Sequence, residues 1–148
     1  MTSYRKGDYE ISTDKNRLQL NIVHKYLSEE AYWCKNIPLK TLEKGIENSC
    51  CFGLYFQGQQ IGFARVVTDY ATFAYLADVF ILEPHRGKGL SKWLVQTIMN
   101  HPLLQGMRRW VLGTKDAHGL YEKYAGFKPF KEPGRFMEKH FPDIYKNA

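Results

Sequence analysis

Apolar residues recur at helical spacing in two segments of the first third of the chain. Asp14 can cap the first predicted helix, and Pro38 suits the first turn of the second, which we expect to end near Asn48. The shared apolar faces consist of Leu18, Ile22, Val23, Tyr26 and Leu27 in the first helix, and of Leu39, Leu42 and Ile46 in the second. Both patterns predict amphipathic helices that pack against a core.

The period then changes to that of strands. Residues 50–57 and 61–68 are apolar, β-branched or aromatic runs, and the polar, glycine-containing link between them is typical of a hairpin. Residues 73–82 are apolar on both alternating faces, which predicts a central strand covered on both sides. Asp78 is the one charge inside that strand.

The C-terminal half alternates helices with short strands. A clear helix is marked by five residues at helical spacing, Leu90, Trp93, Leu94, Thr97 and Ile98. Residues 110–113 predict a strand, after which Asp116 can cap a helix that stops at Gly126. One or two further short strands are expected around residues 128–131 and 136–139.

The predicted order is strand, two helices, three strands, helix, strand, helix and strand. This order builds an α/β fold with a mixed central sheet and helices on both faces. The length of 148 residues, 44% hydrophobic and 24% charged, suits one domain over residues 1–148 and excludes disordered and fibrous classes.

Charge is distributed unevenly. The net charge is +6, of which residues 1–74 carry +1 (nine basic, eight acidic) and residues 75–148 carry +5 (twelve basic, seven acidic). An anionic partner is therefore expected on the second half, and nucleic acid, membrane lipid and a phosphorylated cofactor are the candidates. The Arg108-Arg109-Trp110 step favours nucleic acid, but no zinc-finger, RNP or basic-zipper pattern accompanies it.

The patterns of cysteine, histidine and apolar residues exclude several other classes of protein. Three cysteines, Cys34, Cys50 and Cys51, fit neither a disulfide framework nor a zinc site, so we expect reduced structural thiols. The five histidines have no metal-binding spacing, and we expect no metal. Residues 1–6 lead into no signal-peptide core and no apolar stretch approaches the ~20 residues of a membrane span, so we expect a soluble, cytoplasmic protein with no membrane partner.

The segment Arg86-Gly87-Lys88-Gly89-Leu90-Ser91 connects the predicted central strand to the predicted helix that follows it. Glycines there permit a tight turn with outward N–H groups, and the helix dipole together with Arg86, Lys88 and Lys92 favours a diphosphate. The segment does not match the Walker A motif, which needs Ser or Thr after its lysine, because Gly89 follows Lys88. It does not match the dinucleotide-binding motif Gly-x-Gly-x-x-Gly either, because Lys92 occupies the position of the third glycine. A glycine-rich turn without a ligand is the alternative.

Two motifs resemble the GNAT superfamily of acyl-CoA-dependent N-acyltransferases. The pattern Arg/Gln-x-x-Gly-x-Gly/Ala falls on Arg86, Gly89 and Ser91, with serine replacing the usual final small residue. Residues 119–127 are similar to the late helix ending in Tyr-x-x-x-Gly-Phe, with one extra residue between Tyr121 and Gly126. The resemblance implies transfer of an acetyl group from acetyl-CoA to a primary amine of a small molecule or peptide, by direct attack in a ternary complex.

The resemblance also implies roles for particular residues. Tyr121 matches the tyrosine that protonates the departing thiolate, with a packed core tyrosine as the alternative. Asp78, on the strand expected to receive the pantetheine arm, is the candidate base; a structural carboxylate paired with an arginine is its alternative, and Glu83, His118 or a water chain could replace it. A backbone N–H near Val79 or Phe80 is expected to stabilise the oxyanion.

Binding residues follow from the same resemblance. The cofactor-binding set is Val79, Phe80, Ile81, Leu82, Arg86, Gly87, Lys88, Gly89, Leu90, Ser91 and Asp116. An aromatic wall for the acceptor amine is expected from Tyr32, Trp33, Tyr70 and Phe73, which could equally be packing residues. The resemblance makes a homodimer plausible. An acyl-CoA-binding sensor without catalysis is the rival function, and a nucleic-acid-binding protein a more distant one.

Overall fold

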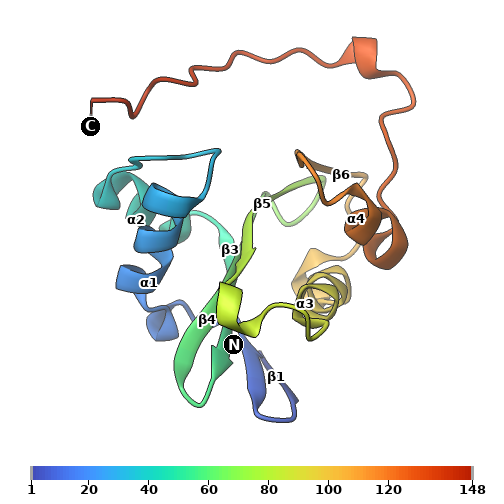
Figure 1. Cartoon of the computed structure of the whole chain (residues 1–148). Coiled ribbons are helices and arrows are strands. Elements are labelled where there is room, and N and C mark those ends of the chain that lie inside the picture. The colour runs from blue at the N-terminus through green and yellow to red at the C-terminus, as the bar shows by residue number, and fades with distance from the viewer. Residues whose placement is uncertain (1, 148) are drawn as a thin grey trace.

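A computed structural model describes residues 2–147, and within them a mixed sheet of six strands forms the centre (Figure 1). The strands are β1 (Ser3–Lys6), β2 (Tyr9–Ser12), β3 (Cys50–Phe56), β4 (Gln59–Thr68), β5 (Phe73–Ile81) and β6 (Arg109–Leu112). They follow one another in sequence order across the sheet. The first five are antiparallel neighbours, whereas β6 runs parallel to β5. The predicted mixed α/β sheet is confirmed.

Four α-helices cover the two faces of this sheet. They are α1 (Leu20–Lys25), which continues into a π-helical turn (Tyr26–Glu30), α2 (Leu39–Glu47), α3 (Leu90–Met99) and α4 (His118–Ala125). Figure 1 shows α1 and α2 on one side of the sheet, and α3 and α4 on the other. Among the described residues, no helix has the length and apolar character needed to cross a membrane.

Each face of the sheet carries its own apolar core. Phe52, on one face, is fully buried in a cluster that includes residues of α3. Phe63 and Phe80, on the other, contact each other and pack with residues of α1 and α2. Tyr26 stacks on Phe80 with a ring-centroid distance of 4.0 Å. The double covering explains why β5 is apolar on both of its faces, as the sequence predicts.

Turn chemistry sets several of the element boundaries. Gln57 and Gly58 both have positive φ (51° and 81°), so β3 and β4 meet in a two-residue turn of the kind that suits their twist. Gly7, with φ 60°, lies in the turn between β1 and β2, where the sequence predicted a single strand. Gly126 caps α4 in the left-handed conformation (φ 73°), as predicted.

Two predicted helix caps are wrong. The Asp14 carboxylate accepts a hydrogen bond from the N–H of Asn16 (2.9 Å), but it caps a separate 3-10 turn, Lys15–Arg17, and α1 begins only at Leu20. Asp116 does not cap α4, because the N-cap position is Ala117. The Thr114 hydroxyl accepts from the N–H of Ala117 instead (3.0 Å). Short polar side chains bond to nearby backbone in many turns, so spacing alone does not identify a helix cap.

The predicted strands at residues 128–131 and 136–139 are also wrong. Within the described part of the chain, residues 128–147 contain a single 3-10 turn at Pro133–Arg135 and no strand. A strand needs a neighbouring strand to accept its backbone hydrogen bonds, and this segment has none beside it. We call residues 128–147 the tail.

Candidate active site

A β-bulge interrupts the ladder between β4 and β5. Two residues of β5, Asp78 and Val79, stand opposite the single residue Ala64 of β4. Asp78 has φ 57°, in the left-handed region that non-glycine residues seldom adopt. A bulge of this kind bends the strand and redirects its side chains.

The second half of β5 has an open edge. β6 pairs with Phe73–Leu76 only, so the strand from Ala77 onward has a neighbour on the β4 side alone. The N–H of Leu82 bonds to the carbonyl of Ile61 (2.8 Å). Along a strand, successive N–H groups point alternately to its two sides. Counting back from Leu82, the N–H of Phe80 points to β4, and those of Val79 and Ile81 point to the open edge. Of the two predicted oxyanion donors, the ladder therefore favours Val79.

The glycine loop leads from this edge into α3. Gly87 and Gly89 have φ of 80° and 75°, and a Cβ added to either would meet no atom within 4 Å. Gly89 is the N-cap of α3 and supplies no side-chain cap. The first helical hydrogen bond runs from the N–H of Trp93 to the carbonyl of Gly89, which leaves the amides of residues 90–92 for an external acceptor. This loop has the open space and the free donors that an anion requires.

Arg86 does more than supply charge to this loop. Its Nε donates to the carbonyl of Ile81 (2.8 Å), and its Nη2 donates to the Tyr26 hydroxyl (3.3 Å). These bonds fasten the loop to the end of β5 and to the helix on the opposite face. Lys88 and Lys92 remain as the two lysines at the start of α3.

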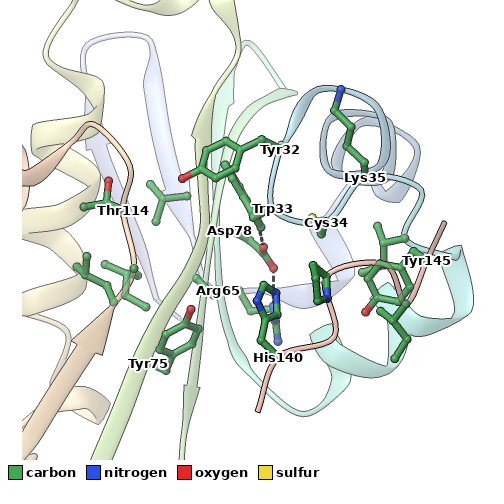
Figure 2. A pocket seen from close by; sticks show the side chains of 18 of the residues that line it. Tyr32, Trp33, Cys34, Lys35, Arg65, Tyr75, Asp78, Thr114, His140 and Tyr145 are labelled. Carbon is green, nitrogen blue, oxygen red and sulfur yellow. Dashed lines mark hydrogen bonds and ion pairs between the residues drawn. The ribbon is translucent and has the colours of Figure 1, made fainter. Parts of the chain in front are cut away.

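A cavity of about 830 Å³ lies where β5 and β6 separate. It is lined by the loop between α1 and α2, by β5, by the loop before α4 and by residues 140–146 of the tail. The predicted site residues that line it are Tyr32, Trp33, Asp78, Val79, Asp116 and Tyr121. Figure 2 shows Trp33 and Arg65 converging on Asp78, with His140 and Tyr145 of the tail nearby.

Other predicted residues lie elsewhere. Tyr70 and Phe73 are exposed at the turn between β4 and β5 and do not line this cavity. Glu83 and His118, the alternative bases, are exposed and also outside its lining. The cofactor residues other than Val79 and Asp116 lie along the end of β5, the glycine loop and the start of α3, and Leu90 is buried under that helix.

Asp78 is held by two donors. Arg65 Nε lies 2.8 Å from Oδ2, and Trp33 Nε1 donates to Oδ1 at 2.8 Å. Arg65 Nη1 also donates to the Ser49 hydroxyl (3.0 Å), so the network joins the α1–α2 loop, β4 and β5. The side chains of Asp78 and Arg65 are 9% and 22% exposed. The carboxylate is thus paired with an arginine, which is the structural alternative that the sequence left open.

Sequence reasoning missed Arg65 as a site residue. It is the one charged residue within residues 61–68, and it lies opposite Ala77, the residue before Asp78. A lone charge inside an apolar strand was the signal that could have marked Arg65 as a candidate site residue, although not its partner.

Tyr121 brings a protonated hydroxyl to the cavity. It lies on α4, is 8% exposed, and contacts Phe127 edge to face. Burial, and then the negative charge of Asp116, raise the pKa of Tyr121 to about 12. The hydroxyl is therefore a hydrogen-bond donor throughout the physiological pH range.

The thiols lie outside this chemistry. Cys34, Cys50 and Cys51 are all free. Cys34 lines the cavity, but burial raises the pKa of its thiol to about 12, which makes it a poor nucleophile at neutral pH. Among residues 2–147, no group of three or more histidine, cysteine or acidic side chains is arranged to hold a metal ion.

Comparison with known proteins places this geometry among acetyltransferases. Residues 20–127 match the family model described as Acetyltransferase (GNAT) family. A Gibberella zeae protein named as an acetyltransferase is 34% identical over 152 residues, which cover 88% of this chain and 85% of that protein. A solved GNAT-family structure from Xanthomonas campestris pv. campestris is 48% identical with a TM-score of 0.91, covering 94% of this chain and 97% of that one.

A more distant structure shows the same fold. An acetyltransferase from Clostridium acetobutylicum, solved with acetyl-CoA, is 16% identical and has a TM-score of 0.63, covering 89% of this chain and 94% of that chain.

Proposed function

This chain belongs to the GNAT family of acetyltransferases, and we propose that it moves an acetyl group from acetyl-CoA to a primary amine by direct attack in a ternary complex. One observation carries the proposal. Asp78, Val79 and Tyr121 line a single cavity at the point where β5 loses its β6 neighbour. That cavity therefore joins a candidate base, an oxyanion donor and a donor to the leaving group. The acceptor would be a small molecule or a peptide.

The glycine loop fits the diphosphate of the donor substrate. Its free amides at residues 90–92 precede a ten-residue helix, whose dipole favours negative charge at this end. Lys88 and Lys92 add two positive charges, and the absence of a Cβ at Gly87 and Gly89 leaves room for phosphate oxygens. Along the open edge of β5, the N–H group of Ile81 is free to bond with the amide-containing pantetheine arm.

In the proposed reaction the amine nitrogen bonds to the thioester carbonyl carbon and then loses its second proton to water, and the carbon–sulfur bond breaks. The N–H of Val79 is placed on the open edge, where it can donate to the oxygen that becomes negative. The Tyr121 hydroxyl can donate a hydrogen bond to the departing sulfur, which leaves as thiolate and takes its proton from Tyr121 or water. The ammonium of the acceptor must lose a proton before it attacks.

We assign this proton to Asp78, directly or through a water molecule. Of the three candidate side chains, it is the one that lines the cavity, because Glu83 and His118 do not. Each Asp78 oxygen accepts one hydrogen bond within the protein, and each carboxylate oxygen has a second lone pair for a water or an ammonium N–H. Arg65 and Trp33 would then hold the carboxylate in the position from which it accepts the proton.

The proposal is tested by free-thiol release from acetyl-CoA with a panel of amines, polyamines, amino acids, aminoglycosides and peptides. We expect release that depends on one acceptor class, and that is lost in Gly89→Val together with acetyl-CoA binding measured by calorimetry. Gly106→Val is the matched control, since Gly106 also has a positive φ (82°) with no atom within 4 Å of an added Cβ. Equal losses in both variants, or no binding by the unaltered protein at millimolar acetyl-CoA, would overturn the proposal.

A further inference from the structure

Aromatic side chains surround the cavity that contains Asp78. Six of its lining residues are aromatic: Tyr32, Trp33, Tyr75, Tyr121, Phe141 and Tyr145. They come from the α1–α2 loop, β5, α4 and the tail, so rings reach the cavity from several sides. Four of them keep much of their surface exposed, namely Tyr32 (56%), Trp33 (43%), Tyr75 (39%) and Phe141 (58%). Exposed aromatic surface gathered in a concave site is typical of a site that binds an apolar group.

The β-bulge brings Tyr75 and Asp78 to the same face of β5. Residues 75 and 77 share a face because side chains alternate along a strand. The bulge turns the Asp78 side chain to that face, where it meets Arg65. Ala77, the residue between them on this face, adds only a methyl group. In the view of Figure 2, Tyr75 and Tyr32 lie on opposite sides of Asp78, so a molecule bound at this carboxylate has aromatic rings to either side.

Trp33 is fixed beside the carboxylate. Its Nε1 donates to Asp78 Oδ1 at 2.8 Å, and the Tyr32 ring packs against it edge to face with a centroid distance of 5.0 Å. These two contacts hold the exposed indole in one orientation. An ammonium that donates to the second lone pair of the same carboxylate oxygen lies next to this ring, and the attraction between cation and ring adds to the hydrogen bond. The other rings are then left for the rest of the acceptor molecule.

The charges of the cavity lining cancel. Three acidic residues, Asp78, Asp116 and Asp143, are matched by three basic ones, Lys35, Arg65 and Lys146. A polyamine or an aminoglycoside brings several positive charges, and a phosphorylated sugar brings negative ones, but the lining has no excess of the opposite charge for either. The cavity therefore suits an acceptor that has one ammonium group and an otherwise uncharged body.

We propose that the acceptor is a small primary amine with an aromatic body, and that Tyr75 selects this body. The inference rests on the proposed function, because it names the acceptor of the same reaction. The acceptor nitrogen gains the acetyl group and loses one proton to Asp78 and a second to water, while the sulfur of coenzyme A leaves as thiolate and takes its proton from Tyr121 or water. Each stacked pair of rings favours an aromatic body over a saturated one of similar size by about 2- to 13-fold.

The experiment compares two amines that differ only in the saturation of the ring, 2-phenylethylamine and 2-cyclohexylethylamine. Free-thiol release from acetyl-CoA is measured with the full chain. We expect kcat/KM to be about tenfold higher for the phenyl compound. We expect spermidine, a polyamine, to be a poorer acceptor than both. Equal kcat/KM values for the two ring compounds, or a preference for spermidine, would overturn the proposal.

Tyr75→Leu removes the ring and keeps an apolar side chain. We expect the ratio of the two kcat/KM values to fall to about twofold, while kcat/KM for the cyclohexyl compound changes by less than about threefold, as it would in an intact fold. Phe73→Leu is the matched control, because Phe73 lies on the same face of β5 and is 42% exposed but does not line the cavity. It should keep the tenfold ratio. An unchanged ratio in Tyr75→Leu, or an equal fall in Phe73→Leu, would overturn the role of Tyr75.

The outcomes separate this inference from the proposed function. Acetyl transfer to an aliphatic amine, a polyamine or a peptide in preference to the phenyl compound overturns the inference and leaves the proposed function standing. Absence of thiol release with every amine overturns both.

Discussion

Replacing Tyr121 by Phe tests the leaving-group step with little disturbance of the fold. The substitution removes one hydroxyl and keeps the buried ring, whose edge-to-face contact with Phe127 has a centroid distance of 6.1 Å. Within the described residues no side chain is hydrogen-bonded to this hydroxyl, so its loss leaves no buried partner unsatisfied. We expect the free energy of unfolding to change by less than about 1 kcal/mol.

The size of the kinetic effect follows from the pKa of Tyr121. At about 12 it lies well above the pKa of ~8.5 that is ordinary for a thiol, so complete proton transfer to the thiolate is unfavourable. The hydroxyl then contributes mainly a hydrogen bond to a charged atom, about 1.5–3 kcal/mol. This corresponds to a fall in kcat of roughly 10- to 150-fold, below the upper range of general acid catalysis.

The assay is thiol release at saturating acetyl-CoA, with the dissociation constant of acetyl-CoA measured separately by calorimetry. Tyr124→Phe is the control, because Tyr124 lies on the same helix but does not line the cavity. We expect it to behave as the unaltered protein does, and we expect both variants to bind acetyl-CoA normally. If kcat of Tyr121→Phe falls less than about threefold, Tyr121 is a packing residue and the assignment is wrong.

Three further substitutions probe other parts of the molecule. Asp78→Asn should lower kcat by about 100-fold with acetyl-CoA binding unchanged; a kcat within about threefold of the unaltered protein would exclude Asp78 as base. Bonds from Arg17 and Ser3 lower the pKa of Glu10 to about 2 from its ordinary 4.5, so their stabilising effect is present above pH 4.5 and is lost as pH falls toward 2. Glu10→Gln should therefore lower stability by about 1 kcal/mol at pH 7 and not at pH 2, measured by denaturant unfolding. Gly62→Ala should cost about 1–3 kcal/mol, since its Cβ would lie 3.1 Å from a backbone oxygen of β5; an unchanged midpoint would contradict this packing.

Helices and strands with a strong periodic pattern of apolar residues could be predicted from the sequence. Short strands that form only because a neighbouring strand pairs with them could not. Helix α3 and strand β5 carry apolar residues at regular spacing over nine or ten positions, which local sequence fixes well. β1 and β2 are four residues each, too short for a pattern, and they exist because β3 accepts β2 as a neighbour. The tail has strand-like composition, but it forms no strand because nothing in the chain lies beside it.

In the candidate site, too, some features could be predicted from the sequence and others could not. The glycine loop and Tyr121 are marked by motifs, so their positions in the fold could be predicted. The ion pair of Asp78 with Arg65 could not, because alternation along β5 would place Asp78 on the opposite sheet face from Ala77, the residue paired with Arg65. The extra residue of the bulge and the φ of 57° at Asp78 reverse this, and the two side chains meet at 2.8 Å.

The bulge therefore determines where the chemistry takes place. A left-handed φ at a non-glycine residue is unfavourable by roughly 1–2 kcal/mol, and it persists only where its surroundings compensate. Here the hydrogen bonds of Arg65 and Trp33 to Asp78 supply that compensation. The same bulge leaves Asp78 and Val79 together opposite Ala64, so the carboxylate comes directly before the residue whose N–H points to the open edge. One strained residue thus brings the candidate base to the cavity beside the oxyanion donor, which explains why a carboxylate that is structurally paired can still belong to the active site.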